Sequence, residues 1–232
     1  MDQVADQLET ARNAIVDCDY EKAVAACREV LSRHPRHVEA TCLLAEAYRE
    51  QGQRTLAEDL LRRVLSADPE NVLAHWALGL LLRDMEHEEE AFQRLACARE
   101  LAPGNVELAS DMLSVAPDPR SAMKPTRSLL GRYYARAGLY ERAAAEFRSV
   151  VAEAPRRLDV WVALAEVLWR GGSHEEAAEV CEAILAESPH CIKALIILAK
   201  IRQVEGESKA AHHLLALAQE LDPAGSTLAK LS

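Results

Sequence analysis

The residues of this sequence that could carry out chemistry are few, and they begin with six cysteines. The cysteines form neither a CxxC pair nor a regular framework: Cys18, Cys27, Cys42, Cys97, Cys181 and Cys191. A free cysteine behaves as a small apolar side chain when it is buried. We therefore expect buried or incidental thiols, with metal binding and redox chemistry as the lesser alternatives.

Two pairs of histidines are close enough in sequence to serve a metal ion. His34 and His37 flank Pro35, and His212 and His213 are neighbours. Transition-metal sites add further carboxylate or thiolate ligands at defined spacing, and neither pair has them. The sequence also contains no phosphate-binding loop, dinucleotide fingerprint, HExxH or GxSxG motif. We expect no metal, no cofactor, no catalytic residues and no enzyme activity.

The balance of charges argues against two classes of partner. The chain has 232 residues, with 27 Lys and Arg against 37 Asp and Glu, and its formal charge is −10. An acidic chain without a basic run lacks the surface that attracts nucleic-acid phosphates or anionic lipids. No window approaches the roughly 18 apolar residues of a spanning helix, and the first residues do not resemble a secretion signal. These features predict a soluble cytoplasmic protein with no nucleic-acid partner and no membrane insertion.

The elements that would position functional side chains follow from a repeat. Prolines recur every 34 residues in two sets of three: Pro35, Pro69 and Pro103, then Pro155, Pro189 and Pro223. Twelve residues before each proline stands an alanine: Ala23, Ala57, Ala91, Ala143, Ala177 and Ala211. Apolar residues recur eight and five positions before each proline, with the spacing of one helix face. A fixed period of this length indicates a repeat architecture.

Each repeat is expected to contain two helices that are separated by a short break. Four of the six breaks contain a glycine at the same phase: Gly52, Gly138, Gly172 and Gly206. A glycine there suits a left-handed residue that ends a helix, because it has no side chain to clash. Cys18 and Glu86 occupy this phase in the other two breaks, so the sequence specifies no glycine turn in them. The repeating proline ends the second helix.

On these residues the sequence resembles the tetratricopeptide repeats, a family with a 34-residue helix–turn–helix unit. One repeat carries the family pattern at Leu130, Gly131, Tyr134, Ala143, Phe147 and Pro155. The first repeat departs most, with Thr10 at the leucine phase, which suits an end repeat. The resemblance covers nearly the whole chain, and it implies an all-α, right-handed α-solenoid of about six antiparallel helix pairs.

The repeats fall into two blocks, because the two sets of prolines are out of phase. We expect a first block over 1–105, a lone capping helix with a Pro-rich linker over 106–124, a second block over 125–225 and the start of an incomplete capping helix over 226–232. Within the middle segment the helix covers 106–116, and three prolines keep 117–124 out of a helix. The linker is either a surface loop or a hinge, and the chain is either complete or a fragment.

A binding surface is what remains for function. In the family, the first helix of each repeat lines a concave groove that holds a peptide or a partner helix. The resemblance places these residues in the groove: Leu8, Arg12, Arg49, Leu73, Trp76, Leu80, Arg83, Arg132, Arg136, Trp169, Arg170, Lys193 and Lys200. Trp76, Leu80 and Trp169 would be apolar anchors, and the cations of the second block would orient an acidic segment. Alternatively, the tryptophans fill gaps between helices, and Glu166 and Asp159 offset the cations.

The predicted function is a protein–protein interaction scaffold or adaptor that binds a peptide or partner protein in this groove. Two alternatives stay open: a recruiting or regulatory domain of a larger enzyme, and a module that self-associates through its repeat ends. Some family members bind chaperone C-termini through a five-residue clamp of cations and asparagines. At those phases the first block lacks the clamp and the second keeps only Arg132 and Lys193, so we do not expect that role.

Overall fold

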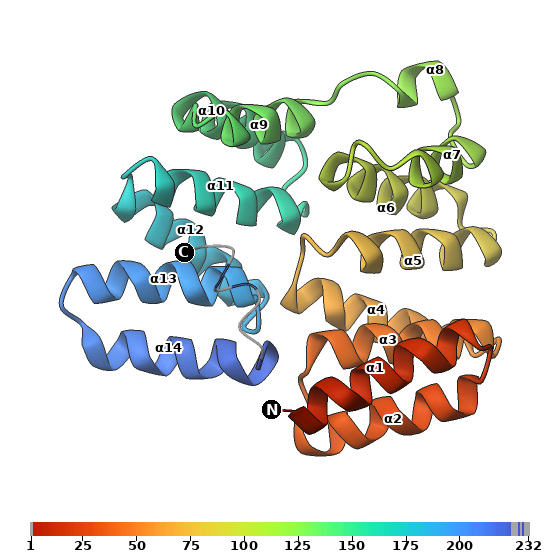
Figure 1. The fold of residues 1–232 in the computed structure, drawn as a ribbon. Helices are drawn as coiled ribbons and strands as arrows, with labels where there is room; N and C mark the ends of the chain where they lie inside the picture. The colour runs from red at the N-terminus through yellow and green to blue at the C-terminus, as the bar shows by residue number, and fades with distance from the viewer. Residues whose placement is uncertain (1, 224–226, 228, 230–232) are drawn as a thin grey trace. The chain divides into compact units, whose positions relative to one another are not determined.

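The computed structural model describes residues 2–223, 227 and 229, and the regular elements among them are helices (Figure 1). No strand occurs in these described ranges. The chain forms two compact units. The first unit contains the residues up to Ser66, Asn71–Pro117 and Glu220–Pro223, and the second contains Ala67–Glu70 and Asp118–Gln219.

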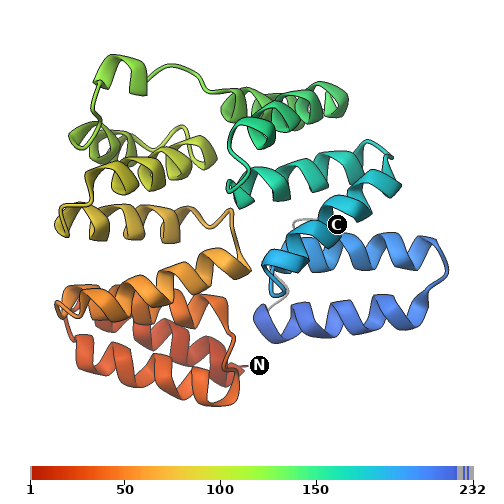
Figure 2. The same cartoon turned by 180° about the vertical axis from the view of Figure 1, so that it is seen from behind.

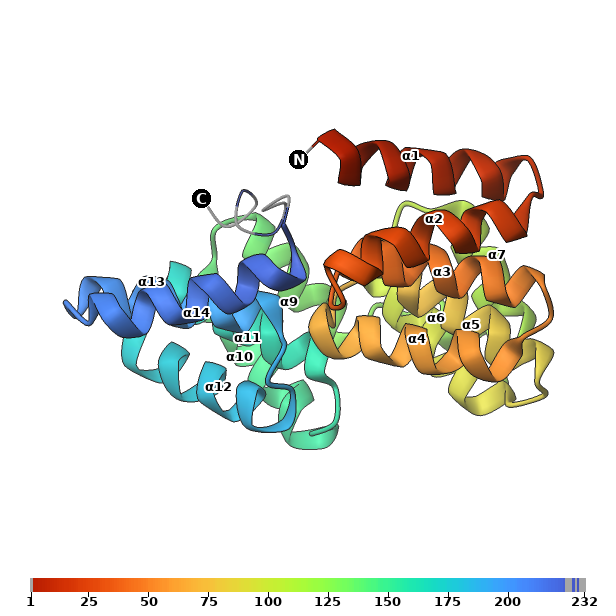
Figure 3. The same ribbon diagram turned by 90° about the horizontal axis from the view of Figure 1, so that it is seen from below.

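The helices of the first unit follow the predicted pairs. They are α1 (Asp2–Val16), α2 (Tyr20–Arg33), α3 (Val38–Glu50), α4 (Arg54–Ala67), α5 (Val72–Asp84), α6 (Glu88–Leu101) and α7 (Val106–Ser114). The two helices of a pair lie side by side, as α1 and α2 do in Figure 3. The first helices of successive pairs also contact one another, α1 with α3 and α3 with α5.

The second unit repeats this arrangement. Its helices are α8 (Pro119–Ala122), α9 (Arg127–Arg136), α10 (Tyr140–Glu153), α11 (Leu158–Arg170), α12 (His174–Glu187), α13 (Ile192–Val204) and α14 (Ser208–Leu221). Helix α9 packs on α10 and α11 packs on α12, and α13 and α14 run antiparallel in Figure 1 and Figure 2. The first helix α11 contacts both α9 and α13. These pairs confirm the prediction of an all-α solenoid.

The turns inside the pairs use the left-handed conformation at every predicted phase. Gly52, Gly138, Gly172 and Gly206 have φ between 73° and 85°. Cys18 and Glu86 have φ of 58° and 64°, although neither is a glycine and a side chain makes this conformation unfavourable. The shape of the turn is therefore set by the packing of the two helices, even where the sequence supplies no glycine.

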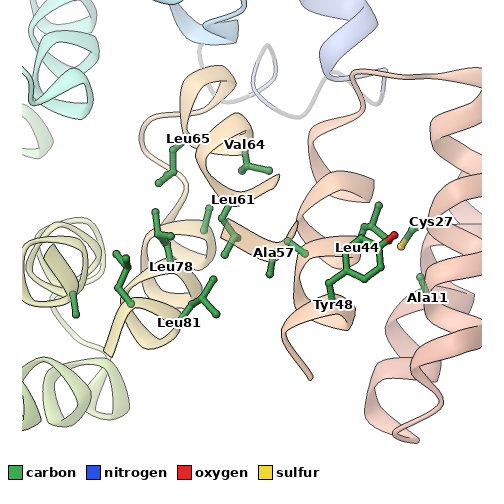
Figure 4. Packing of buried hydrophobic residues seen from close by; sticks show 14 of the residues in the cluster. Ala11, Cys27, Leu44, Tyr48, Ala57, Leu61, Val64, Leu65, Leu78 and Leu81 are labelled. Carbon is green, nitrogen blue, oxygen red and sulfur yellow. The ribbon is translucent and has the colours of Figure 1, made fainter. Parts of the chain in front are cut away.

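Small residues allow the two helices of a pair to approach closely. The six repeating alanines are at most 3% exposed, which explains why a small side chain recurs there. In the first unit one apolar cluster joins the six successive helices from α1, which contributes Ala11, to α6, which contributes Ala91. Figure 4 shows part of this cluster, with Cys27, Leu44, Leu61 and Leu78 among its residues. This continuous core holds the first helices in a fixed register within the unit.

The predicted middle segment contains more helix than expected. Helix α7 covers Val106–Ser114 and packs on α6, close to the expected range. The linker contains one helical turn, α8, which begins at Pro119 after Asp118 has capped it. Proline is tolerated there because the first residue of a helix needs no backbone N–H partner. The incomplete helix expected over 226–232 lies outside the described residues, apart from Thr227 and Ala229.

Candidate interaction surface

Side chains from three successive first helices of the second unit meet on one surface. We call this surface the second-unit face and define it by Arg132 of α9, Asp159, Glu166 and Trp169 of α11, and Lys193 and Lys200 of α13. The helices bring these side chains together because α11 packs against both of its neighbours. Four of the predicted groove residues are among them, namely Arg132, Trp169, Lys193 and Lys200.

Lys193 is the centre of the charges on this face. Its Nζ donates to Oε2 of Glu166 at 2.7 Å and also contacts the carboxylate of Glu70. Burial alone would lower the pKa of Lys193, but the two carboxylates outweigh it, and the pKa is raised well above its ordinary value. Lys193 is therefore a permanent cation held between two acids.

Arg132 bridges two carboxylates in a similar way. Its Nη2 donates to Asp159 at 3.2 Å, and its Nη1 donates to Glu70 at 2.5 Å. Asp159 also accepts two hydrogen bonds of 2.8 Å from Arg157. Its side chain is 4% exposed, and a buried carboxylate is stable only when it is paired in this way. Asp159 thus holds the guanidinium of Arg132 in place from the neighbouring helix.

Trp169 extends the face with an aromatic ring between two cations. The Nζ of Lys200 lies 4.7 Å from the ring centroid, and Cζ of Arg170 lies 6.0 Å from it. Both distances permit a cation–π interaction. Arg170 also donates to Oε1 of Glu166 at 2.9 Å. The half-buried ring therefore belongs to the same network as Lys193, through Glu166.

In the first unit, the predicted anchor Trp76 contacts helix α7. Its Nε1 donates to Oδ2 of Asp111 at 2.8 Å, and Arg83 lies 3.8 Å from the same carboxylate. The two residues stand seven positions apart on α5, so both point from one side of that helix. Helix α7 thus lies against α5 as the first helix of a further pair would.

The other predicted groove residues of the first unit do not form one cluster. Leu8 is 5% exposed and packs in the core with Val30 and Ala40, so it offers little surface to a partner. Leu73 is 64% exposed, and Leu80 is half-buried. The charged members face neighbouring acids: Arg12 contacts Glu9 and Glu39, and Arg49 contacts Glu50. Arg136 of the second unit is exposed.

Sequence reasoning missed two acidic residues of these surfaces. Glu70 stands in the turn after Pro69, where no pattern distinguishes it from the residues that follow the other repeating prolines. Asp111 lies in α7, outside the regular repeats. Both pair with residues more than 30 positions away, and spacing along the chain carries no signal for such contacts.

Most of the six thiols are buried. Cys27, Cys97, Cys181 and Cys191 are buried, Cys42 is half-buried and Cys18 is exposed.

Within the described ranges no group of three His, Cys, Asp or Glu side chains is placed to hold a metal ion. No helix in the same ranges is long and apolar enough to cross a membrane. The surfaces found here offer charge, hydrogen bonds and an aromatic ring, which are means of binding.

Comparison with known proteins identifies the class of this fold. Two family profiles, both described as tetratricopeptide repeat, match residues 18–81 and 128–190. Together they cover more than half of the chain. The chain belongs to the tetratricopeptide repeat family.

The chain is also similar to several solved structures. The P58(IPK) TPR domain is 18% identical over 99% of this chain, which spans 64% of that chain, with a TM-score of 0.45. A Thermobaculum terrenum O-GlcNAc transferase mutant is 28% identical over 58% of this chain and 26% of its own, with a TM-score of 0.49. The TPR2AB domain of yeast Sti1, in a complex with pHSP90, is 14% identical over 98% and 95% of the two chains, with a TM-score of 0.43. A comparison with curated proteins gave no match.

Proposed function

We propose that this protein is an interaction scaffold that binds a peptide or a partner protein along the first helices of its repeats. Membership in the tetratricopeptide repeat family supports a role in protein interaction. The observation that carries the proposal is the second-unit face, where an aromatic ring, two lysines and an arginine from three helices converge. Aromatic and arginine side chains contribute most of the binding free energy at many protein interfaces.

The described part of the chain offers a better basis for binding than for catalysis. Four charged groups of the second-unit face form ion pairs with one another, Lys193 with Glu166 and Arg132 with Asp159, and the neighbouring Arg170 also pairs with Glu166. Such pairs hold side chains in defined positions, which suits recognition of a complementary surface. A cytoplasmic location, the concave groove and self-association through the repeat ends stay predictions.

The proposal is tested by affinity capture from a native lysate with the full chain as bait. We compare the wild type with Trp169→Ala, which removes the aromatic ring of the face. Trp161→Ala is the matched control: Trp161 also lies on α11, but its indole donates to the carbonyl oxygen of Pro155. We expect a partner that the wild type and Trp161→Ala retain and that Trp169→Ala loses. A partner that all three retain equally would place the binding surface elsewhere.

A further inference from the structure

Glu70 occupies a position between two cations of the second-unit face. Residues Ala67–Glu70 belong to the second unit, and each oxygen of the Glu70 carboxylate meets a different cation. Oε1 accepts from Nη1 of Arg132 at 2.5 Å, and Oε2 accepts from Nζ of Lys193. The side chain is 14% exposed, against 11% for Arg132 and 20% for Lys193. The carboxylate is thus bound at two points in a largely buried site.

Each of the two cations also pairs with an acid other than Glu70. Lys193 keeps an ion pair with Glu166, and Arg132 keeps one with Asp159, which Arg157 also holds. These partners come from α11 or the turn that precedes it. Without the Glu70 carboxylate, each cation would still have one acid beside it. Among the ion pairs of the described residues, the two acids Glu166 and Asp159 would then face the four cations Arg132, Arg157, Arg170 and Lys193, so the site would attract another anion.

We infer that Arg132 and Lys193 form a binding site for a carboxylate side chain, that Glu70 fills it from within the chain, and that a Glu or Asp of a partner protein fills it in its place. The inference rests on the proposed function, because it specifies the chemistry of the segment that the second-unit face binds. It adds a regulatory consequence: Glu70 is a tethered competitor, and a partner must displace it.

The occupant is an acidic side chain within a segment, because that is the chemistry of the group bound there now. Glu70 has peptide bonds on both sides, and it follows Pro69, whose ring fixes one backbone dihedral angle. Two cations that each take one oxygen of a carboxylate select for charge and for geometry together. A nucleic acid is disfavoured as the occupant, since the chain carries a formal charge of −10.

The test uses the chain's own segment as a probe in trans. A fluorescent peptide with the sequence of residues 66–72, SADPENV with blocked ends, is titrated with the full chain, and its anisotropy is measured. We compare the wild type, Glu70→Gln and Glu70→Ala. Glu153→Gln is the charge-matched control, because Glu153 is exposed at the end of α10. Circular dichroism confirms that each variant is folded.

We expect both Glu70 variants to bind the peptide at least about tenfold more tightly than the wild type and Glu153→Gln do. A tethered group competes at an effective concentration in the millimolar range, and the variants lack that competitor. A peptide with glutamine in place of its glutamate should bind at least about tenfold more weakly to Glu70→Gln. Adding Lys193→Met to Glu70→Gln should weaken binding of the original peptide by a similar factor.

Three results would overturn the inference: no gain for the Glu70 variants over the wild type, equal binding of the glutamine peptide, or no effect of Lys193→Met. None of these would by itself contradict the proposed function, since the Trp169→Ala capture tests the face without a carboxylate probe. Loss of a captured partner on Trp169→Ala, together with no peptide binding to Glu70→Gln, would leave the scaffold proposal standing and remove only the carboxylate site.

Discussion

Gly131 of α9 packs directly against the ring of Phe147 in α10, and a Cβ placed on the glycine would lie 2.6 Å from Cε1 of that ring. Phe147 is fully buried, so its ring has little room to move away. The two helices of this pair approach each other at the glycine, which is why the residue can serve there despite its low helix propensity. The contact gives a direct test of how tightly the pair is packed.

We expect Gly131→Ala to destabilise the protein by up to about 2 kcal/mol. The added methyl group gains about 1 kcal/mol of helix propensity, but overpacking of a close-packed core costs roughly 1–3 kcal/mol. Urea unfolding followed by circular dichroism measures the difference. Gly104→Ala is the control, because a Cβ on Gly104 meets no atom within 4 Å. A neutral or stabilising Gly131→Ala would show that the ring of Phe147 yields easily.

Replacing Glu86 by glycine should stabilise the protein. Glu86 is exposed and has φ of 64°, a conformation that costs a residue with a side chain roughly 1–2 kcal/mol. Glycine removes this cost, but its greater freedom stabilises the unfolded chain by about 0.4–1 kcal/mol. The free energy of unfolding should therefore rise by about 0.5–1 kcal/mol. The thermal unfolding midpoint should rise accordingly.

The reverse substitution, made at the equivalent turn between α9 and α10, provides a control for the strain at Glu86. A Cβ on Gly138 would meet no atom within 4 Å, and its φ is 73°. Gly138→Ala should therefore lower stability by about 1 kcal/mol through backbone strain alone. If Glu86→Gly lowered the unfolding midpoint instead, the glutamate side chain would have to contribute an interaction that outweighs the strain.

The thiols should react in an order set by burial. Burial raises the pKa of Cys27 to about 12 and, with smaller effects of neighbouring charges, that of Cys191 to about 12. Because the thiolate is the reactive form, iodoacetamide at about pH 8 should label exposed Cys18 and leave Cys27 and Cys191 intact. Peptide mass mapping before and after addition of urea measures this. Native labelling of Cys191 as fast as that of Cys18 would contradict the prediction.

Stability should fall on acidification through Glu70. Burial alone would raise the pKa of Glu70, but Lys193 and Arg132 outweigh it, and the pKa lies below its ordinary value of 4.5. A carboxylate with a lowered pKa in the folded state stabilises the fold above its unfolded pKa and loses this effect as the pH falls through the folded value. Glu70→Gln should therefore cost about 2 kcal/mol at neutral pH.

The pH dependence separates this charge effect from a packing effect. The difference in unfolding free energy between wild type and Glu70→Gln should shrink as the pH falls through the lowered pKa of Glu70, because the carboxyl group is then protonated in both the folded and the unfolded state. Urea midpoints at several pH values measure it, with Glu153→Gln as the charge-matched control. A difference that stays constant with pH would mean that shape or hydrogen bonding, and not charge, is what the substitution removes.

The sequence predicted the repeating elements well because their signals are local. The helix pairs, the buried alanines and the glycine turns each depend on residues within one 34-residue unit. The contacts of the candidate face depend instead on side chains far apart in the chain, as Glu70 and Lys193 are. The sequence placed Arg132, Trp169, Lys193 and Lys200 at suitable phases, and yet it also assigned buried Leu8 to the groove, since helix phase alone does not say how far a neighbour covers a residue.

The hydrogen bond from Trp76 to Asp111 should tie α7 to α5 within the first unit. Trp76→Phe keeps an aromatic ring but removes the donor, and Asp111→Asn keeps the shape but removes the charge that also faces Arg83. We expect each substitution to lower the unfolding free energy by up to about 1.5–3 kcal/mol, the range for a hydrogen bond to a charged group. The double variant should cost less than the sum of the two, because both substitutions act on the same charge-assisted hydrogen bond. Strict additivity in urea unfolding would show that the two residues contribute independently and that α7 is held by its apolar contacts with α6 alone.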